Sequence, residues 1–478
     1  MRITFIVSLL TILLSNSVYS QNDKIGTSQK FDEVITYINR LYVDDVDAEE
    51  LTNTAIVALL EKLDPHSTFI PKKEVSGANE RINGNFVGVG IRFQILKDTL
   101  MVVATISGGP SEKIGLLAGD QIVTIAENNV AGIGLQNSQV REKLLGDKGT
   151  KVAVVVKRKN VAKPLSFTIT RDVIPVHSVD AAYMVTEETG YIKLNTFSRT
   201  SHEEVREGIK KLKGLGMKNL IFDLQGNGGG LLYTAKDLAD EFLSDDKLIV
   251  YSKGRVQPRI DLNSEKKGLF EKGKLILLTD EYSASASEIM SGAVQDWDRG
   301  LIVGRRTFGK GLVQRPIELS DGSQIRLTIA RYYTPSGRFI QKSYDDADEY
   351  HKDLLNRYEN GEFMNQDSIK FPDSLKHTTL IKGRTVYGGG GIMPDFFVPL
   401  DTNGISDYYS SIIRGGHFNA FTLSYINNNR KQLEEKYPEF SDFKKEFKVS
   451  EELIEELAAY TEKADSTLTF DEEGYRES

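Results

Sequence analysis

The chain contains no cysteine in its 478 residues. This absence excludes disulfide bonds, a thiol nucleophile, cysteine-based metal sites and a lipid-bearing N-terminal cysteine, so the fold depends on packing for its stability. An excess of positive charge is missing too, because 60 Lys and Arg residues face 68 Asp and Glu residues and leave a net charge of −8. That balance argues against a nucleic-acid partner and favours solubility.

Long hydrophobic runs are scarce, and a short one stands at the N-terminus. The first residues, MRITFIVSLLTILLSNSVYS, place one Arg before an apolar run at 3–14 and end in small residues. This pattern is typical of a secretory signal peptide, here 1–20, and predicts export, with the periplasm as the destination. The alternative is a membrane anchor, but a bilayer-spanning helix needs roughly 20 apolar residues.

The length of the chain predicts two or more domains, since a domain usually has about 100–200 residues. The first, at 21–85, is expected to be helical. Apolar residues keep helical spacing over 31–41 and again over 51–63, and Pro65 ends the second helix.

Residues 86–172 form a different unit, with short strands around two small helices. Their order and length resemble a PDZ domain, and the stretch GPSEKIGLLAGDQIVTI at 109–125 is similar to one that bacterial PDZ domains share. PDZ domains bind a peptide's terminal carboxylate on backbone N–H groups and add the peptide to a sheet as an extra strand. The residues at the carboxylate-binding position are Gly88, Val89, Gly90 and Ile91. A Gly-rich bend at a strand start is the alternative for these four alone.

Apolar strands and helices alternate through 173–400, which predicts a mainly parallel sheet. The segments NLIFDL and LILL are continuously apolar, as expected of strands covered by helices on both faces. Within this core, 341–380 is polar and reads as an insertion. The final region, 401–478, is predicted to be helical.

The stretch TDEYSASASEIM at 279–290 places three serines where an apolar strand gives way to a helix. Ser285 and Glu288 satisfy a capping box, so Ser285 has a purely structural interpretation. The same position suits a nucleophile, because the N–H of Ala286 and the helix dipole point toward any developing oxyanion.

A serine nucleophile needs a general base, and none of the six histidines stands in a recognisable triad motif. Lys310, between Gly309 and Gly311, is the other candidate. Its pKa must fall from about 10.4 to about 7–8, which burial away from anions achieves. Gln314 can hold the amine without adding charge. The stretch that ends in Lys310 is also nearly a phosphate-binding loop, but Gly311 replaces the Ser or Thr that binds magnesium.

Five motifs follow one another along the chain: LDPHS at 63–67, DLQGNGGG at 223–230, SASASEI at 283–289, FGKGLVQ at 308–314 and GGGGIMPD at 388–395. Together they resemble the motifs of the C-terminal processing peptidases, also called tail-specific proteases, and the resemblance runs from about residue 30 to 400. Gln225 stands where that family commonly has Arg, and Gly228 is an additional glycine.

The resemblance implies a role for each site residue. Ser285, which lies 25 residues before Lys310 as in the family, is the implied nucleophile. Lys310 is the implied base and Gln314 its orienting partner, while the amides of Ala286 and Gly229 are the implied oxyanion donors. Structural roles fall to Ser283, Ser287, Glu288, Asp223 and His66.

The resulting interpretation is an exported serine endopeptidase that recognises the C-terminal tails of protein substrates. Its expected fold is α/β and multidomain, with a PDZ domain inserted before a crotonase/ClpP-like peptidase core and helical N- and C-terminal regions. The resemblance implies no metal, nucleotide or other cofactor and no nucleic acid, and it leaves an adaptor or regulator and a homodimer open. The alternatives are an inert peptide-binding scaffold of the same fold and an esterase or amidase of small molecules.

Overall fold

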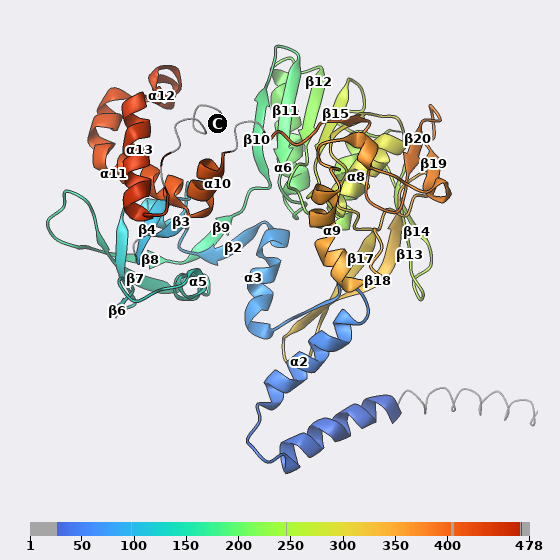
Figure 1. The fold of residues 1–478 in the computed structure, drawn as a ribbon, viewed down its shortest axis with the longest axis horizontal. Coiled ribbons are helices and arrows are strands. Elements are labelled where there is room, and N and C mark those ends of the chain that lie inside the picture. Colours follow the sequence, from blue (N-terminus) through green and yellow to red (C-terminus); the bar gives the residue numbers. More distant parts are fainter. Residues whose placement is uncertain (1–25, 97, 245, 403–405, 469, 471–478) are drawn as a thin grey trace, which may run out of the picture.

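The computed structural model describes residues 26–96, 98–244, 246–402, 406–468 and 470. The predicted signal peptide at 1–20 lies outside the described residues. Within these ranges, no helix combines the length and the apolar character that crossing a membrane requires. Figure 1 shows an α/β core, a smaller inserted domain with the C-terminal helices beside it, and an arm of N-terminal helices.

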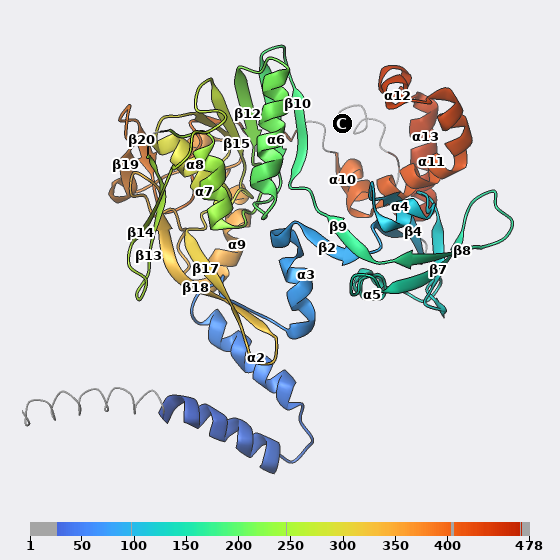
Figure 2. The same ribbon diagram turned by 180° about the vertical axis from the view of Figure 1, so that it is seen from behind.

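The N-terminal region is helical, as predicted. Residues 26–41 form a helix that extends away from the rest of the molecule in both ribbon views (Figures 1 and 2). The next helix, α2 (Ala48–Glu61), begins after Asp47, whose carboxylate accepts hydrogen bonds from two first-turn amides and so caps the helix. It ends ahead of Pro65, and α3 (Lys72–Asn83) follows.

The main sheet of the core is parallel except at one edge, in agreement with the alternating pattern of the sequence. Its first strand pairs antiparallel with the second, and every later pair is parallel. The strands lie in the order β10 (Val179–Met184), β11 (Thr189–Leu194), β12 (Asn219–Asp223), β15 (Leu275–Thr279), β16 (Leu301–Gly304) and β21 (Phe396–Phe397).

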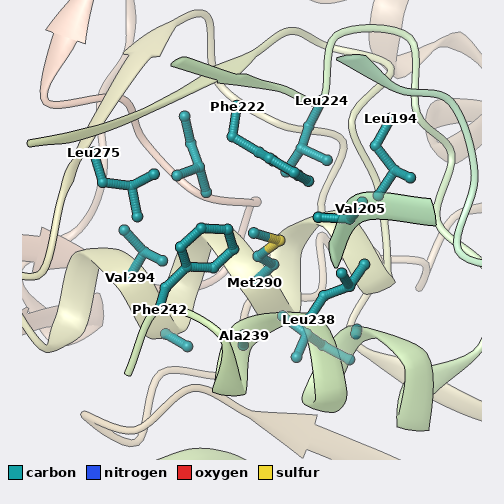
Figure 3. Packing of buried hydrophobic residues seen from close by; sticks show 14 of the residues in the cluster. Leu194, Val205, Phe222, Leu224, Leu238, Ala239, Phe242, Leu275, Met290 and Val294 are labelled. Atoms are coloured by element: carbon teal, nitrogen blue, oxygen red, sulfur yellow. The ribbon is translucent and has the colours of Figure 1, made fainter. Parts of the chain in front are cut away.

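Helices pack on this sheet and enclose the largest part of the hydrophobic core. They are α6 (Ser201–Gly214), α7 (Leu232–Asp240) and α8 (Ala286–Asp296). Figure 3 shows Phe222 of β12 above Phe242 and Met290, all of them buried. Burying a side chain of this size contributes about 1.5–3 kcal/mol. This packing fixes the position of α8, and with it the residue that begins the helix.

A second sheet lies beside the first and carries the segment that follows Lys310. The strands β17 (Leu312–Glu318) and β18 (Gln324–Tyr333) form an antiparallel hairpin. On the other side of β18 lie β1 (Thr68–Ile70) and β13 (Leu248–Lys253), and β14 (Ile260–Asn263) pairs with β13. The N-terminal region therefore contributes a strand to the core.

The inserted domain, residues 86–172, has its own sheet and its own buried apolar cluster. Short strands surround two small helices, in agreement with the PDZ prediction. The sheet order is β3 (Ile91–Leu96), β4 (Thr99–Thr105), β5 (Gln121–Ile125), β7 (Lys151–Lys157) and β8 (Leu165–Thr170), with β6 (Asn128–Asn129) paired to β5. The helices are α4 (Pro110–Lys113) and α5 (Asn137–Leu144), and an antiparallel ribbon of β2 (Asn85–Gly88) and β9 (Asp172–Pro175) joins the domain to the core.

The C-terminal region is helical, as predicted, and it packs against the inserted domain (Figures 1 and 2). Arg430 donates a hydrogen bond to the carbonyl of Ala118 at 2.6 Å, and Lys159 donates to the Asn428 side chain at 2.5 Å. The helices are α10 (Asp407–Arg414), α11 (His417–Lys436), α12 (Phe440–Glu446) and α13 (Glu451–Ala464). Nothing in the sequence pattern predicted this docking.

The polar segment 341–380 is folded onto the core. It contains α9 (Ala347–Glu359) and two short 3₁₀ turns, η1 (Gln366–Ser368) and η2 (Asp373–Leu375). A small hairpin of β19 (Lys376–Thr378) and β20 (Thr385–Tyr387) follows. The interpretation of this segment as a mere insertion is therefore incomplete.

A buried ion pair between Asp296 and Arg338 provides a test of the core. Both side chains are 0% exposed, and Arg338 Nη2 lies 2.5 Å from Asp296 Oδ1. We predict that Asp296→Ala lowers the free energy of unfolding by about 3–5 kcal/mol, because it leaves the guanidinium buried without a counter-charge. The double variant Asp296→Ala/Arg338→Met should lose less. Equal losses in guanidinium chloride unfolding of the two variants would contradict this account.

Candidate active site

Ser285 lies where the parallel sheet gives way to α8, directly before the first residue of that helix. Its backbone angles, φ 57° and ψ −110°, are unusual for a residue with a side chain and cost of order 1–3 kcal/mol. Ser283 and Ser287 are fully buried, and their hydroxyls donate to the carbonyls of Leu224 and Asn227. Ser285 is partly exposed, so it is the serine of the three that a substrate can reach.

Lys310 lies in the loop between β16 and β17, where most of its side chain is enclosed. Its Nζ donates a hydrogen bond to Oε1 of Gln314 at 3.0 Å. Burial lowers the pKa of Lys310 below the ordinary lysine value, the Glu288 and Asp64 carboxylates oppose this shift, and the Arg326 guanidinium adds to it. The direct partner of the Lys310 amine is a neutral amide, which adds no negative charge that would stabilise the ammonium form and raise the pKa again.

Glu288 joins the serine to the lysine. Its fully buried carboxylate accepts the backbone N–H of Ser285 at 2.7 Å and that of Lys310 at 2.9 Å on the same oxygen, Oε2. The other oxygen accepts the N–H of Gly309 and the hydroxyl of Thr307. Burial raises the pKa of Glu288 to about 7, against the opposing effect of these donors. The bond from Ser285 N–H also belongs to the predicted capping box, so a capping role does not exclude the predicted role as nucleophile.

Tyr332 of β18 makes a second connection between the same two residues. Its hydroxyl lies 3.1 Å from the carbonyl oxygen of Ser285 and also within hydrogen-bonding distance of the carbonyl oxygen of Lys310. Two independent groups, Glu288 on α8 and Tyr332 on β18, therefore hold the backbones of Ser285 and Lys310 side by side.

The two predicted oxyanion donors lie close to the serine. Ala286 is the first residue of α8, where backbone N–H groups lack partners within the helix. A Cβ placed on Gly229 would come within 2.8 Å of the Ser285 Cβ and 2.9 Å of the Ala286 nitrogen, so only glycine fits there. The N–H of Gly229 donates to Oδ1 of the buried Asn227 at 2.9 Å. The N–H of Gly229 must therefore share or break its bond to Asn227 before it can donate a hydrogen bond to an oxyanion.

The residues predicted to bind a peptide carboxylate lie in the inserted domain, apart from the serine and the lysine. Gly88 ends β2 and Ile91 begins β3, which is an edge strand of the sheet that the structure describes. Ser111 donates to the carbonyl of Val89 through its N–H and, at 2.6 Å, through its hydroxyl. Gly90 adopts φ +74°, a conformation that glycine accommodates without strain.

His66 was predicted to be structural, but its backbone carbonyl reaches the site, which its motif did not reveal. Gln314 Nε2 donates to the backbone carbonyl of His66 at 2.5 Å, so the LDPHS turn contacts the lysine's partner. Burial lowers the pKa of His66 to about 4, with a further contribution from the Lys310 charge, so the ring is neutral at pH 7. Because the contact uses a backbone carbonyl, the identity of the side chain gave no signal.

The segment 341–380 also supports the lysine loop, which its polar composition did not reveal. Arg357 of α9 donates to the carbonyl of Arg306 at 2.7 Å. Glu362 accepts from Arg306 and from Arg357 and completes a buried network next to the loop. No group of three or more His, Asp or Glu side chains in the described ranges is arranged to hold a metal ion.

Comparison with known proteins gives a consistent result. The model of peptidase family S41 matches residues 188–349, and a family of unknown function, DUF8443, matches 408–478. The carboxy-terminal-processing protease of Bartonella bacilliformis is 34% identical over 337 residues, which cover 69% of this chain and 76% of that protein. The carboxy-terminal processing protease CtpA of Bacillus subtilis is 30% identical, with 70% and 72% covered.

Two solved structures are also similar to parts of the chain. The photosystem II D1 C-terminal processing protease is 26% identical, with 76% of this chain and 84% of that chain covered and a TM-score of 0.39. A PDZ domain of the carboxy-terminal protease from Vibrio cholerae is 30% identical and covers 19% of this chain and 97% of its own, with a TM-score of 0.17.

These matches define the class of the protein as an S41 serine peptidase. The chain belongs to the C-terminal processing protease family, which confirms the prediction made from its motifs.

The charge of Arg326 provides a test of the lysine's environment. Replacing Arg326 with Gln removes a cation that lowers the pKa of Lys310, so that pKa should rise and more lysine should be protonated at a given pH. We predict that the acid limb of the pH profile of kcat/KM moves to higher pH, because this limb reports the pKa of the essential base in the free enzyme. Arg326→Lys keeps the charge and serves as the control. An unchanged acid limb, or one at lower pH, in Arg326→Gln would argue against Lys310 as the titrating base.

Proposed function

We propose that Ser285 and Lys310 form the catalytic dyad of this peptidase and that Gln314 orients the lysine. The observation that carries the proposal is the setting of the Lys310 amine. It is largely buried, it donates to a neutral amide, and its backbone shares one carboxylate oxygen with that of Ser285. Such a setting favours the uncharged amine that a general base requires.

In this mechanism neutral Lys310 accepts the proton of the Ser285 hydroxyl as the oxygen attacks the scissile carbonyl. The N–H groups of Ala286 and Gly229 stabilise the oxyanion of the tetrahedral intermediate. The lysine ammonium then gives its proton to the departing amine, and an acyl ester remains on Ser285. Water, deprotonated by Lys310, hydrolyses that ester and restores the enzyme.

The inserted domain is proposed to select substrates by their C-terminal tails. A bound tail adds to the edge strand β3, and its carboxylate binds at the loop of Gly88, Val89, Gly90 and Ile91. The bonds from Ser111 to Val89 support this proposal, because they hold a loop carbonyl in the domain interior, away from an incoming carboxylate. An adaptor or regulator, and a homodimer formed through the helical ends, belong to the same proposal.

Export to the periplasm is also proposed, and it rests on the sequence of residues 1–20 alone. The second candidate function, a peptide-binding scaffold without peptidase activity, would share the loop of the inserted domain. The enclosed lysine beside Ser285 favours the enzyme, because a scaffold gains nothing from a buried amine whose pKa is lowered.

The dyad can be tested with Ser285→Ala and Lys310→Ala on a loosely folded reporter protein. We predict that each variant loses kcat by about 10⁴-fold or more, because the two side chains act as one unit and removing either removes nearly the whole effect. Binding of the reporter tail should be unchanged in both variants, since the inserted domain lies apart from the dyad. Cleavage by either variant at close to the wild-type rate would refute the dyad.

Tail recognition requires a separate comparison, between reporters that differ only in their last three residues, three alanines against three aspartates. We expect the wild-type kcat/KM to differ between them by about tenfold, which corresponds to 1.4 kcal/mol of binding energy. Equal cleavage of both reporters would leave the dyad intact and remove the role of the inserted domain.

A further inference from the structure

The turn at 63–67 belongs to the N-terminal region, yet it contacts Gln314 beside the proposed dyad. Neither its motif nor its position in the chain explains what this contact does. We propose that Asp64 is a positioning residue for the peptidase reaction: it shapes the turn whose His66 carbonyl fixes the amide of Gln314, and through Gln314 the amine of Lys310. This inference rests on the proposed role of Lys310 as the base.

Asp64 organises the turn with both of its carboxylate oxygens. Oδ1 accepts the backbone N–H groups of His66 and Ser67, each at 2.8 Å. Oδ2 accepts the hydroxyl of Ser67, also at 2.8 Å. Asp64 is only 8% exposed, so these bonds are shielded from water. This side chain therefore determines the direction in which the His66 carbonyl points.

The same carboxylate attaches the turn to the strand that faces Gln314. Thr328 of β18 donates its hydroxyl to Asp64 Oδ1 at 3.1 Å, and its N–H donates to the Ser67 hydroxyl at 3.1 Å. Thr328 is the cross-strand partner of Gln314 in the β17–β18 hairpin. The turn is thus held against the residue pair that carries the lysine's partner.

The orientation of the Gln314 amide decides whether the lysine can act as a base. A carbonyl accepts hydrogen bonds and cannot donate them, so the His66 carbonyl must face the NH₂ group of Gln314. The oxygen of Gln314 then faces Lys310 and accepts one of its N–H groups. In the reverse orientation the NH₂ group would donate into the lone pair of the neutral amine. The turn therefore leaves that lone pair available for the proton of Ser285.

The test compares Asp64→Ala with Asp64→Asn on fluorescently labelled casein. An alanine removes every acceptor at this position, whereas an asparagine keeps the Oδ1 that receives His66, Ser67 and Thr328. We expect Asp64→Ala to lose kcat by about 10- to 100-fold, the effect of a misplacement of about 1 Å at a catalytic group. The KM of Asp64→Ala should stay within about twofold of the wild-type value, because substrate binding is retained. Asp64→Asn should recover most of the activity, because it retains the geometry of the turn.

A double-mutant cycle separates positioning from general damage to the fold. If Asp64 acts through Gln314, then Asp64→Ala should cost little further activity in a Gln314→Ala background. The matched control is Asp321→Ala, at the far end of the same hairpin, where Asp321 also accepts an N–H and a hydroxyl from one serine, Ser323. This control should keep wild-type kcat. If Asp64→Ala does not fold, Ser67→Ala weakens the same turn and should lower kcat in the same way.

The outcomes also separate this inference from the proposed dyad. If Ser285→Ala and Lys310→Ala are inactive while Asp64→Ala behaves like Asp321→Ala, the dyad stands and the positioning role is wrong. The role is equally wrong if Asp64→Ala costs as much in the Gln314→Ala background as in the wild type. If Lys310→Ala remains active, the proposed dyad itself fails.

Discussion

The geometry of the site depends on one buried carboxylate. Glu288 accepts the backbone N–H groups of both Ser285 and Lys310 on a single oxygen, and it holds the loop before Lys310 with the other. The acceptor is isolated from solvent, so each of these bonds is stronger than a comparable bond in water. Tyr332 makes the second connection between the serine and the lysine, through their carbonyl oxygens.

The two catalytic candidates are positioned by different parts of the core, and this division explains the architecture around them. Ser285 depends on the parallel sheet and on the packing of α8, whereas Lys310 and Gln314 depend on the β17–β18 hairpin. The N-terminal region reaches this hairpin through β1 and the 63–67 turn, and the segment 341–380 reaches the lysine loop through Arg357. The C-terminal helices instead dock on the inserted domain. Parts of the chain that look peripheral in the sequence are therefore supports of the site or of the inserted domain.

The sequence predicted the parts of the structure that local chemistry determines. The alternation of strands and helices predicted the parallel sheet, Pro65 predicted the end of α2, and the motifs predicted the family. It did not reveal the contact of Gln314 with the His66 carbonyl or the bond between Gly229 and Asn227, because one partner in each bond is a backbone group that every residue possesses. Glu288 was assigned to helix capping alone, since a capping box explains its bond to the N–H of Ser285. Its hydrogen bond from the N–H of Lys310 joins distant parts of the chain and leaves no local sequence pattern.

The central claim is that the amine of Lys310 is uncharged often enough to act as a base. The most direct test is an NMR titration of protein labelled at lysine Cε, with the Lys310 signal identified by its loss in Lys310→Arg. We predict that this signal titrates clearly below the ordinary lysine value of 10.5, because the amine is buried beside a neutral amide. A Lys310 signal that titrates at or above that value would contradict the account.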